Sequence, residues 1–142
     1  MLTTNQIQSH FVDIIDIAKT RYPLQQWLHK TPTIEVSPLK GQNGLAYSTG
    51  HIIINSAFLS TSAVGCLRKT ICHEIAHLVV GIHQAHNKKW ESVFDELCSL
   101  AVDLSSKRHE IEKQQVKDNI PYKYRLLGYL TAVSYTHLTL PT

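Results

Sequence analysis

Residues 70–90, TICHEIAHLVVGIHQAHNKKW, are the stretch around which the rest of the chain is organised. They contain the motif H-E-x-x-H, in which His73 and His77 are four positions apart. Residues with this spacing share one face of an α-helix, so two imidazoles can point at one metal ion. Glu74 lies one position round the helix from His73, where it can reach a metal-bound water as a general base without being a ligand. The stretch therefore predicts a site for one Zn²⁺ ion on a helix.

Apolar residues at helical spacing extend this helix in both directions. The spacing predicts a helix over residues 63–81, with Thr61 or Ser62 as its cap and a glycine at its end. Asn87 is a natural N-cap for a second long helix over residues 88–104. The apolar face of this second helix consists of Trp90, Val93, Phe94, Leu97, Ala101 and Leu104. We expect the first helix to lie between a hydrophobic core and a metal-binding cleft.

The segments outside the motif predict an α+β fold. Residues 3–20 have the apolar spacing of an N-terminal helix. Residues 31–37, 45–49 and 51–55 are short, contain β-branched residues and are separated by glycine-containing turns. Three such strands in succession predict a small three-stranded antiparallel sheet. The polar residues 105–116 predict a further helix after the two long ones.

A catalytic zinc ion usually has three protein ligands, so the motif needs a third ligand from elsewhere in the chain. His83 lies at the distance found in metzincins, but the glycine of that pattern is one position late, and a methionine turn is missing because the one methionine is Met1. Glu96, in the second helix, has a place that suits the glutamate ligand of a gluzincin. His86 precedes the N-cap Asn87, so it lies in a loop that returns toward the first helix. We therefore favour His86, with His83 and Glu96 as alternatives.

The residues that follow the motif add a second pattern, H-x-x-x-W, formed by His86 and Trp90. A third pattern lies upstream and consists of Gly44, Ala46, Ile52, Ile54 and Asn55. Together with H-E-x-x-H, these patterns resemble the SprT-like (Spartan-type) zinc metallopeptidase family over roughly residues 3–125. The resemblance implies a zincin-like minimal metallopeptidase, with an N-terminal helix, a small sheet, an active-site helix and a following packing helix. It assigns residues 1–132 to one SprT-like metallopeptidase domain.

The resemblance also implies a chemistry. The zinc ligands would be His73, His77 and His86. Glu74 would activate a zinc-bound water for hydrolysis of a peptide bond, and His83 and Tyr124 are candidates for a supporting or transition-state role. The substrate would be a protein or peptide that binds as an extended strand along residues 45–49 or 51–55. The family resemblance points to DNA-associated or DNA-crosslinked proteins, and so to the repair of DNA–protein crosslinks.

The net charge of +3 is concentrated near the C-terminus. Residues 1–106 carry eight basic and eight acidic side chains, whereas residues 107–142 carry six basic and three acidic ones. The basic segment 107–125 could therefore contact DNA, although a solvated helix face followed by a loop explains the same charges. Residues 133–142, VSYTHLTLPT, resemble the translated read-through of a sequencing adaptor, so we expect them to be a non-native tail.

Cysteine usage and hydropathy indicate the compartment. The three cysteines, Cys66, Cys72 and Cys98, have no C-x-x-C spacing and predict free buried thiols. The chain has no apolar run near the roughly 18 residues that span a membrane, and its first residues lack a signal-peptide pattern. These features predict a cytoplasmic protein with no membrane partner. Residues 121–125 resemble the tyrosine-rich strand that precedes a zinc ribbon in the family, but no cysteine follows, so we expect one zinc ion.

Two other functions fit the same residues. In a nucleic-acid-associated factor, the zinc would be mainly structural, and His83 could close the site as a fourth ligand. In a regulatory peptidase of a phage or mobile element, the zinc site would be catalytic but would act on one dedicated target.

Overall fold

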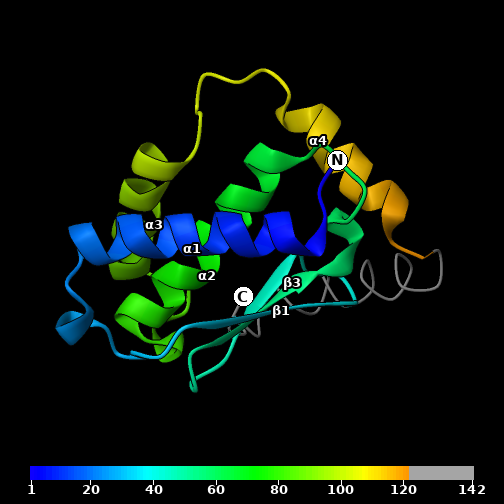
Figure 1. Cartoon of the computed structure of the whole chain (residues 1–142). Helices are drawn as coiled ribbons and strands as arrows, with labels where there is room; N and C mark the ends of the chain where they lie inside the picture. Colours follow the sequence, from blue (N-terminus) through cyan, green and yellow to red (C-terminus); the bar gives the residue numbers. More distant parts are fainter. Residues whose placement is uncertain (122–142) are drawn as a thin grey trace.

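The computed structural model describes residues 1–121 (Figure 1). Over these residues the fold is α+β, with four α-helices and one mixed sheet of three strands. The helices are α1 (Thr4–Arg21), α2 (Val64–Val80), α3 (Lys88–Ala101) and α4 (His109–Asn119). The strands are β1 (Thr33–Ser37), β2 (Gly44–Ala46) and β3 (His51–Asn55). Three short 3-10 helices complete the described elements: η1 (Leu24–Gln26), η2 (Ser56–Phe58) and η3 (Ile82–Gln84).

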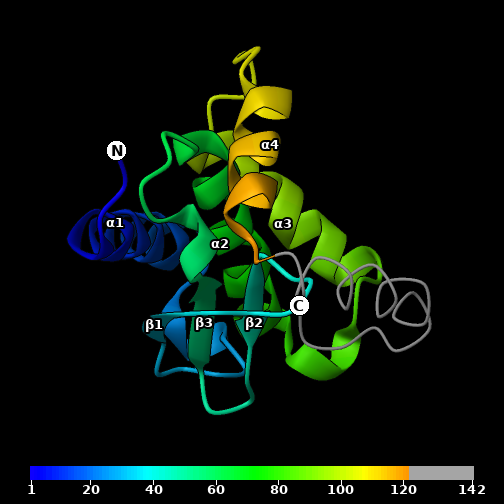
Figure 2. The ribbon, with the colours of Figure 1, turned by 90° about the vertical axis from the view of Figure 1, so that its right-hand side faces the viewer.

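The sheet has the order β1-β3-β2, which Figure 2 shows with the helices above it. β2 pairs with β3 in antiparallel fashion, but β1 pairs with β3 in parallel. The prediction of an antiparallel sheet is therefore wrong for β1. After β1, the chain crosses to the far edge of the sheet through residues 38–43 and returns through the β2–β3 hairpin, so β3 occupies the centre. Ile52 and Ile54 of β3 are fully buried, as expected for a central strand.

β2 is shorter than predicted, because residues 47–49 belong to the turn before β3 rather than to the strand. In that turn the Gly50 N–H donates to the Tyr47 carbonyl at 2.9 Å. Gly50 has φ +93, and the Thr31 carbonyl oxygen lies where a β-carbon would be, so this position needs glycine. In the order β1-β3-β2, β2 is an edge strand, and it contacts α2.

α2 is the central helix, and it contacts α1, α3, α4, β2 and β3. Four residues of its predicted apolar face, Leu67, Ile71, Ile75 and Leu78, have no exposed surface. The fifth, Ile82, lies in η3 after the end of α2 and is half-buried. The residue at its N-cap is Ala63, so the prediction of a Thr61 or Ser62 cap is wrong. Instead, Oε1 of Glu112 in α4 accepts a hydrogen bond from the Cys66 N–H in the first turn of α2 at 2.9 Å. A carboxylate from a distant helix therefore caps the helix that carries the motif.

The other helices agree with the sequence to within a turn. Thr3 caps α1 in a capping box with Gln6, and Asn87 caps α3 as predicted. α3 ends at Ala101 instead of residue 104, which leaves Leu104 exposed. α4 begins at His109 rather than residue 105, because Asp103 accepts hydrogen bonds from the N–H and hydroxyl of Ser105 and forms a turn there.

The predictions for the cysteines, for membrane spans and for the C-terminal segments have different outcomes. The three cysteines are free and buried, which confirms the prediction. Among residues 1–121, the helices are all too short or too polar to cross a membrane. Tyr124, the end of the basic segment (122–125) and the predicted non-native tail (133–142) lie outside the described residues.

Candidate metal centre

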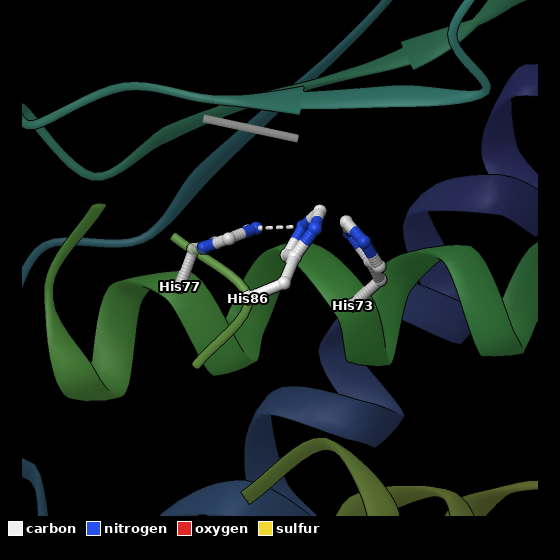
Figure 3. Close-up of side chains that lie close together, drawn as sticks. All are labelled: His73, His77 and His86. Atoms are coloured by element: carbon white, nitrogen blue, oxygen red, sulfur yellow. Dashed lines mark hydrogen bonds between the residues drawn. The ribbon is translucent and has the colours of Figure 1, made fainter. Parts of the chain in front are cut away.

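Three histidines from two parts of the chain converge beside α2 (Figure 3). His73 and His77 project from α2, and His86 comes from the loop between η3 and α3. One ring nitrogen from each residue lies within 4.8 Å of the other two. Burial grades across the cluster, from buried His77 through half-buried His73 to exposed His86. The cluster therefore has one open side, as a site that admits substrate must have.

The spacing of the imidazoles fits a metal ion. The Nε2 atoms of His77 and His86 are 3.2 Å apart. Two nitrogens bound to one tetrahedral zinc ion at about 2.0–2.1 Å are separated by about 3.3 Å. The three side chains His73, His77 and His86 could thus hold a metal ion, as the sequence predicted. Imidazole nitrogens suit zinc and also other first-row metal ions.

The local sequence explains how His86 reaches α2. The Asn87 side chain accepts a hydrogen bond from the Trp90 N–H at 3.0 Å and donates one to Gln84 Oε1 at 2.6 Å. These bonds begin α3 and close the turn before it. Ala85 has φ 52 and ψ −142, a conformation that residues other than glycine rarely adopt, immediately before His86. Together, the turn and the cap direct the third imidazole toward the first two.

Trp90 packs against all three histidines. Its ring centroid lies 4.8 Å from that of His73, 5.3 Å from that of His77 and 4.5 Å from that of His86. Its indole N–H donates to the His73 carbonyl at 3.3 Å, which fixes the ring against α2. Phe94, one turn later in α3, stacks on Trp90 at 4.8 Å. The tryptophan of the H-x-x-x-W pattern therefore forms a rigid aromatic surface on which the imidazoles are oriented.

Glu74 is almost completely buried next to the histidine cluster. Its Oε2 lies 2.9 Å from His73 Nδ1. Its Oε1 is buried without a hydrogen-bond partner among the described residues. Because buried carboxylate oxygens are normally satisfied, Oε1 is available to a water molecule or a substrate.

The edge strand β2 lies directly against Glu74. A β-carbon placed on Gly44 would be 3.0 Å from both Cγ and Oε2 of Glu74 and 2.9 Å from Cγ2 of Thr70. This close approach requires glycine at position 44. Asn55 supports the same region, because its side-chain amide donates to the carbonyls of Leu39 and Gln42 in the segment that leads into β2.

Burial controls protonation in the centre. It lowers the pKa of His73 to about 4, so this imidazole is neutral at pH 7 and has a lone pair for a metal ion. Burial also raises the pKa of Glu74 well above its usual value, and the nearby His86 acts in the opposite direction. A bound cation would act like His86 and favour the ionised carboxylate.

A comparison with protein families identifies the family of the chain. The model of the SprT-like family matches residues 18–114, more than half of the chain, and this range includes all three histidines and Glu74. The chain belongs to the SprT-like family. The comparisons with curated proteins and with solved structures found no match. Membership of the SprT-like family supports a function of the metallopeptidase type.

The structure places the alternative ligands away from the centre of this SprT-like protein. His83 lies in η3 and contacts the Gln84 side chain at 3.2 Å. Glu96 accepts a hydrogen bond from Arg21 of α1 at 2.9 Å. Among the described residues, the group that could hold a metal ion contains neither of them. A supporting or transition-state role for His83 stays a prediction, and Tyr124 lies outside the described residues.

The site of this SprT-like protein also includes residues that the sequence reasoning missed. Gly44 and Asn55 are part of the upstream pattern, but the sequence alone does not explain why these two residue types are needed there. The sequence pattern places Phe94 on an apolar helix face, and none of the motifs includes Lys69. Lys69 precedes His73 by four residues, so the helical spacing that relates His73 to His77 also places Lys69 on the face of α2 that carries these two histidines.

Proposed function

We propose that this protein is a zinc-dependent endopeptidase of the SprT-like type, with a zincin-like active site on α2. One observation carries the proposal: a buried carboxylate, Glu74, lies beside a cluster of three histidines and has an oxygen without a partner among the described residues. A carboxylate in this position is the general base that hydrolysis requires. The SprT-like family membership supports the same conclusion.

Each residue of the site has a separate role in the proposed hydrolysis. His73, His77 and His86 would hold the ion. Zinc, when bound, supplies a Lewis acid that polarises the scissile carbonyl and lowers the pKa of water. Glu74 accepts the proton of the attacking water and delivers it to the amine nitrogen of the leaving group. Trp90 keeps the imidazoles in place while the peptide is cleaved.

The substrate is an extended segment of a protein, bound along the β2 edge. β2 pairs on one side only within the described sheet, whereas β3 is paired on both sides. Because β3 is central, we propose β2 rather than residues 51–55 as the docking strand of the two that the sequence suggested. Since the Gly44 backbone lies against Glu74, a peptide hydrogen-bonded along β2 passes the general base.

DNA-associated or DNA-crosslinked proteins are the substrates that we propose. The family resemblance suggests them, and the basic segment 107–125 offers charges for DNA. In the described part of that segment, Lys107, Arg108, Lys113 and Lys117 are exposed. Binding through such residues would weaken steeply as salt rises.

The Glu74→Gln variant tests the proposed function. We expect it to bind zinc like the wild type, because Glu74 is not among the ligands, and to lose cleavage of an unfolded protein such as casein by at least about 100-fold. Zinc content and cleavage are measured with and without single-stranded DNA. Glu110→Gln, a change at an exposed glutamate of α4, serves as the matched control. Full activity of Glu74→Gln would rule out this mechanism.

The same assays distinguish the other two functions. A zinc-containing protein that binds DNA in a salt-dependent manner but cleaves nothing would be a nucleic-acid-associated factor with a structural zinc site. A protein that cleaves one natural target and leaves unfolded proteins intact would be a regulatory peptidase. Among the described residues, no fourth ligand joins the histidine cluster, which favours a catalytic site over a closed structural one.

A further inference from the structure

A cavity of about 360 Å³ opens next to the metal centre, toward the N-terminal half of α2. The walls that matter here come from three helices and include Lys69, His73, Glu74, Phe94, His109 and Lys113. The start of β2 forms the opposite wall. Because the proposed metal ligand and general base form part of its lining, a side chain of a bound substrate can enter this cavity next to the scissile bond.

The lining of the cavity is basic. Among the described residues it contains two lysines and, besides the proposed metal ligand His73, the half-buried His109, whereas Glu74 is the one acidic residue. Lys113 is exposed, and among residues 1–121 its one ion pair is a loose contact of 3.9 Å with the exposed Glu110. An anionic group in the cavity would therefore meet two ammonium groups against one carboxylate, so the described lining carries a net positive charge.

Lys69 is the central charge of this lining. It is half-buried, and among the described residues it has no ion pair and no hydrogen bond. Lys69 also lines a neighbouring hollow with Asp103 and Glu112, but it forms an ion pair with neither of them. A half-buried ammonium group that forms no ion pair is partly desolvated, so an incoming carboxylate gains a strong charge-assisted hydrogen bond. Lys69 lies one helical turn before His73 on the same face of α2, which keeps that carboxylate close to the reacting peptide bond.

We propose that this cavity is a substrate subsite that selects an acidic side chain, aspartate or glutamate, adjacent to the scissile bond, with Lys69 as the specificity-determining residue. This inference rests on the proposed endopeptidase function. A nucleic acid phosphate has the same charge, but a phosphodiester in this cavity would occupy the space beside Glu74 that the substrate peptide needs. Phe94 provides an apolar wall for the methylene groups of the acidic side chain.

The test uses the whole chain loaded with zinc and a mixture of peptides from a digested proteome, with cleavage sites identified by mass spectrometry. The wild type should show enrichment of aspartate and glutamate at one position next to the cleaved bond. Lys69→Glu should reduce this enrichment about tenfold and favour lysine or arginine instead, because the charge of the subsite is reversed. Lys69→Gln, a milder change, should lose the preference for acids without gaining one for bases.

Lys19→Glu provides the matched control, since it makes the same charge change at an exposed position of a helix. Its cleavage preference should equal that of the wild type. Zinc content and circular dichroism verify that the two Lys69 variants are folded.

The outcomes separate the two proposals. No zinc-dependent cleavage by the wild type would overturn the endopeptidase function and the subsite with it. Cleavage without enrichment of acids, or equal enrichment in Lys69→Glu, would overturn the subsite alone. If a single-stranded DNA oligonucleotide inhibits the wild type but not Lys69→Glu, and acids are not enriched, then the cavity binds nucleic acid and the subsite proposal is wrong.

Discussion

Trp90 connects the histidines of the site to the hydrophobic core. Its ring lies against three imidazoles, and its N–H binds the His73 carbonyl. A smaller side chain would leave a cavity beneath the imidazoles and allow other ring orientations. Because a metal ion binds tightly only where its ligands are held in place, this residue should determine metal affinity without touching the metal.

Substitution of Trp90 tests this role. We expect Trp90→Leu to weaken zinc binding by about ten- to 100-fold, as is typical when residues that support metal ligands are removed. Trp90→Phe keeps an aromatic ring and loses only the N–H bond, so its effect should be smaller. Zinc affinity is measured by competition with a chelator. Trp27→Phe changes a buried tryptophan of the core and should lower stability but not zinc affinity. Equal affinities of Trp90→Leu and the wild type would contradict the role.

Gly44 is a second residue that should act through a neighbour, here Glu74. We expect Gly44→Ala to displace the Glu74 carboxylate, because the new methyl group would meet Cγ and Oε2 of Glu74 at 3.0 Å. A displacement of about 1 Å can lower kcat/KM by about 100-fold, so the smaller shift that this contact requires should lower it by up to about tenfold. Zinc affinity should be retained, since the atoms nearest the added methyl group belong to Thr70 and Glu74 and not to a histidine. Ser48→Ala, in the exposed turn after β2, is the control. Unchanged kcat/KM in Gly44→Ala would show that Glu74 tolerates the methyl group.

At the scale of helices and strands, local sequence patterns predicted where each element lies but not how the strands pair in the sheet. The apolar spacing of residues 63–81 and the Asn87 cap located α2 and α3 to within a few residues, because helical periodicity and capping are properties of adjacent residues. The strand patterns predicted three strands but not their order. A hairpin that inserts β3 between β1 and β2 has the same local sequence as a simple antiparallel meander.

In the candidate site, too, features set by local spacing could be predicted, whereas features set by tertiary packing could not. His73 and His77 followed from a spacing of four, and His86 followed from its place before a cap. The approach of Gly44 to Glu74 could not be predicted, because it depends on how β2 packs against α2. The bond from Cys66 to Glu112 joins residues 46 positions apart, and no local pattern relates them.

The cap that Glu112 provides gives a prediction for α2 as an element. We expect Glu112→Ala to lower the free energy of unfolding by about 1–2 kcal/mol, because the Cys66 N–H would be left unpaired in a buried position. Glu112→Gln retains an acceptor oxygen and should have a smaller effect. Unfolding by urea measures the difference. Glu110→Ala, in the same helix, removes an exposed contact of 3.9 Å and should change stability by less than about 0.5 kcal/mol. Similar effects of Glu112→Ala and Glu110→Ala would show that the cap is unimportant.

At the scale of the whole molecule, the proposed ligands connect two parts of the fold. Two of them belong to the central helix α2, and the third belongs to the loop that begins α3. The three imidazoles come together only when α2 and α3 are packed, so the unfolded chain has no such site. Zinc should therefore stabilise the native state by mass action.

Zinc at 100 times its Kd adds about 2.7 kcal/mol to the stability of a protein that binds it only when folded. For a chain of this size, we expect Tm to rise by about 5–10 °C on addition of zinc and to fall again with a chelator. His86→Ala should abolish most of this shift, because it removes one of the three ligands. His83→Ala should retain the shift, since His83 contacts Gln84 and lies outside the cluster. A shift that disappears in His83→Ala would instead identify His83 as a fourth ligand, and with it the closed structural site that an endopeptidase cannot use.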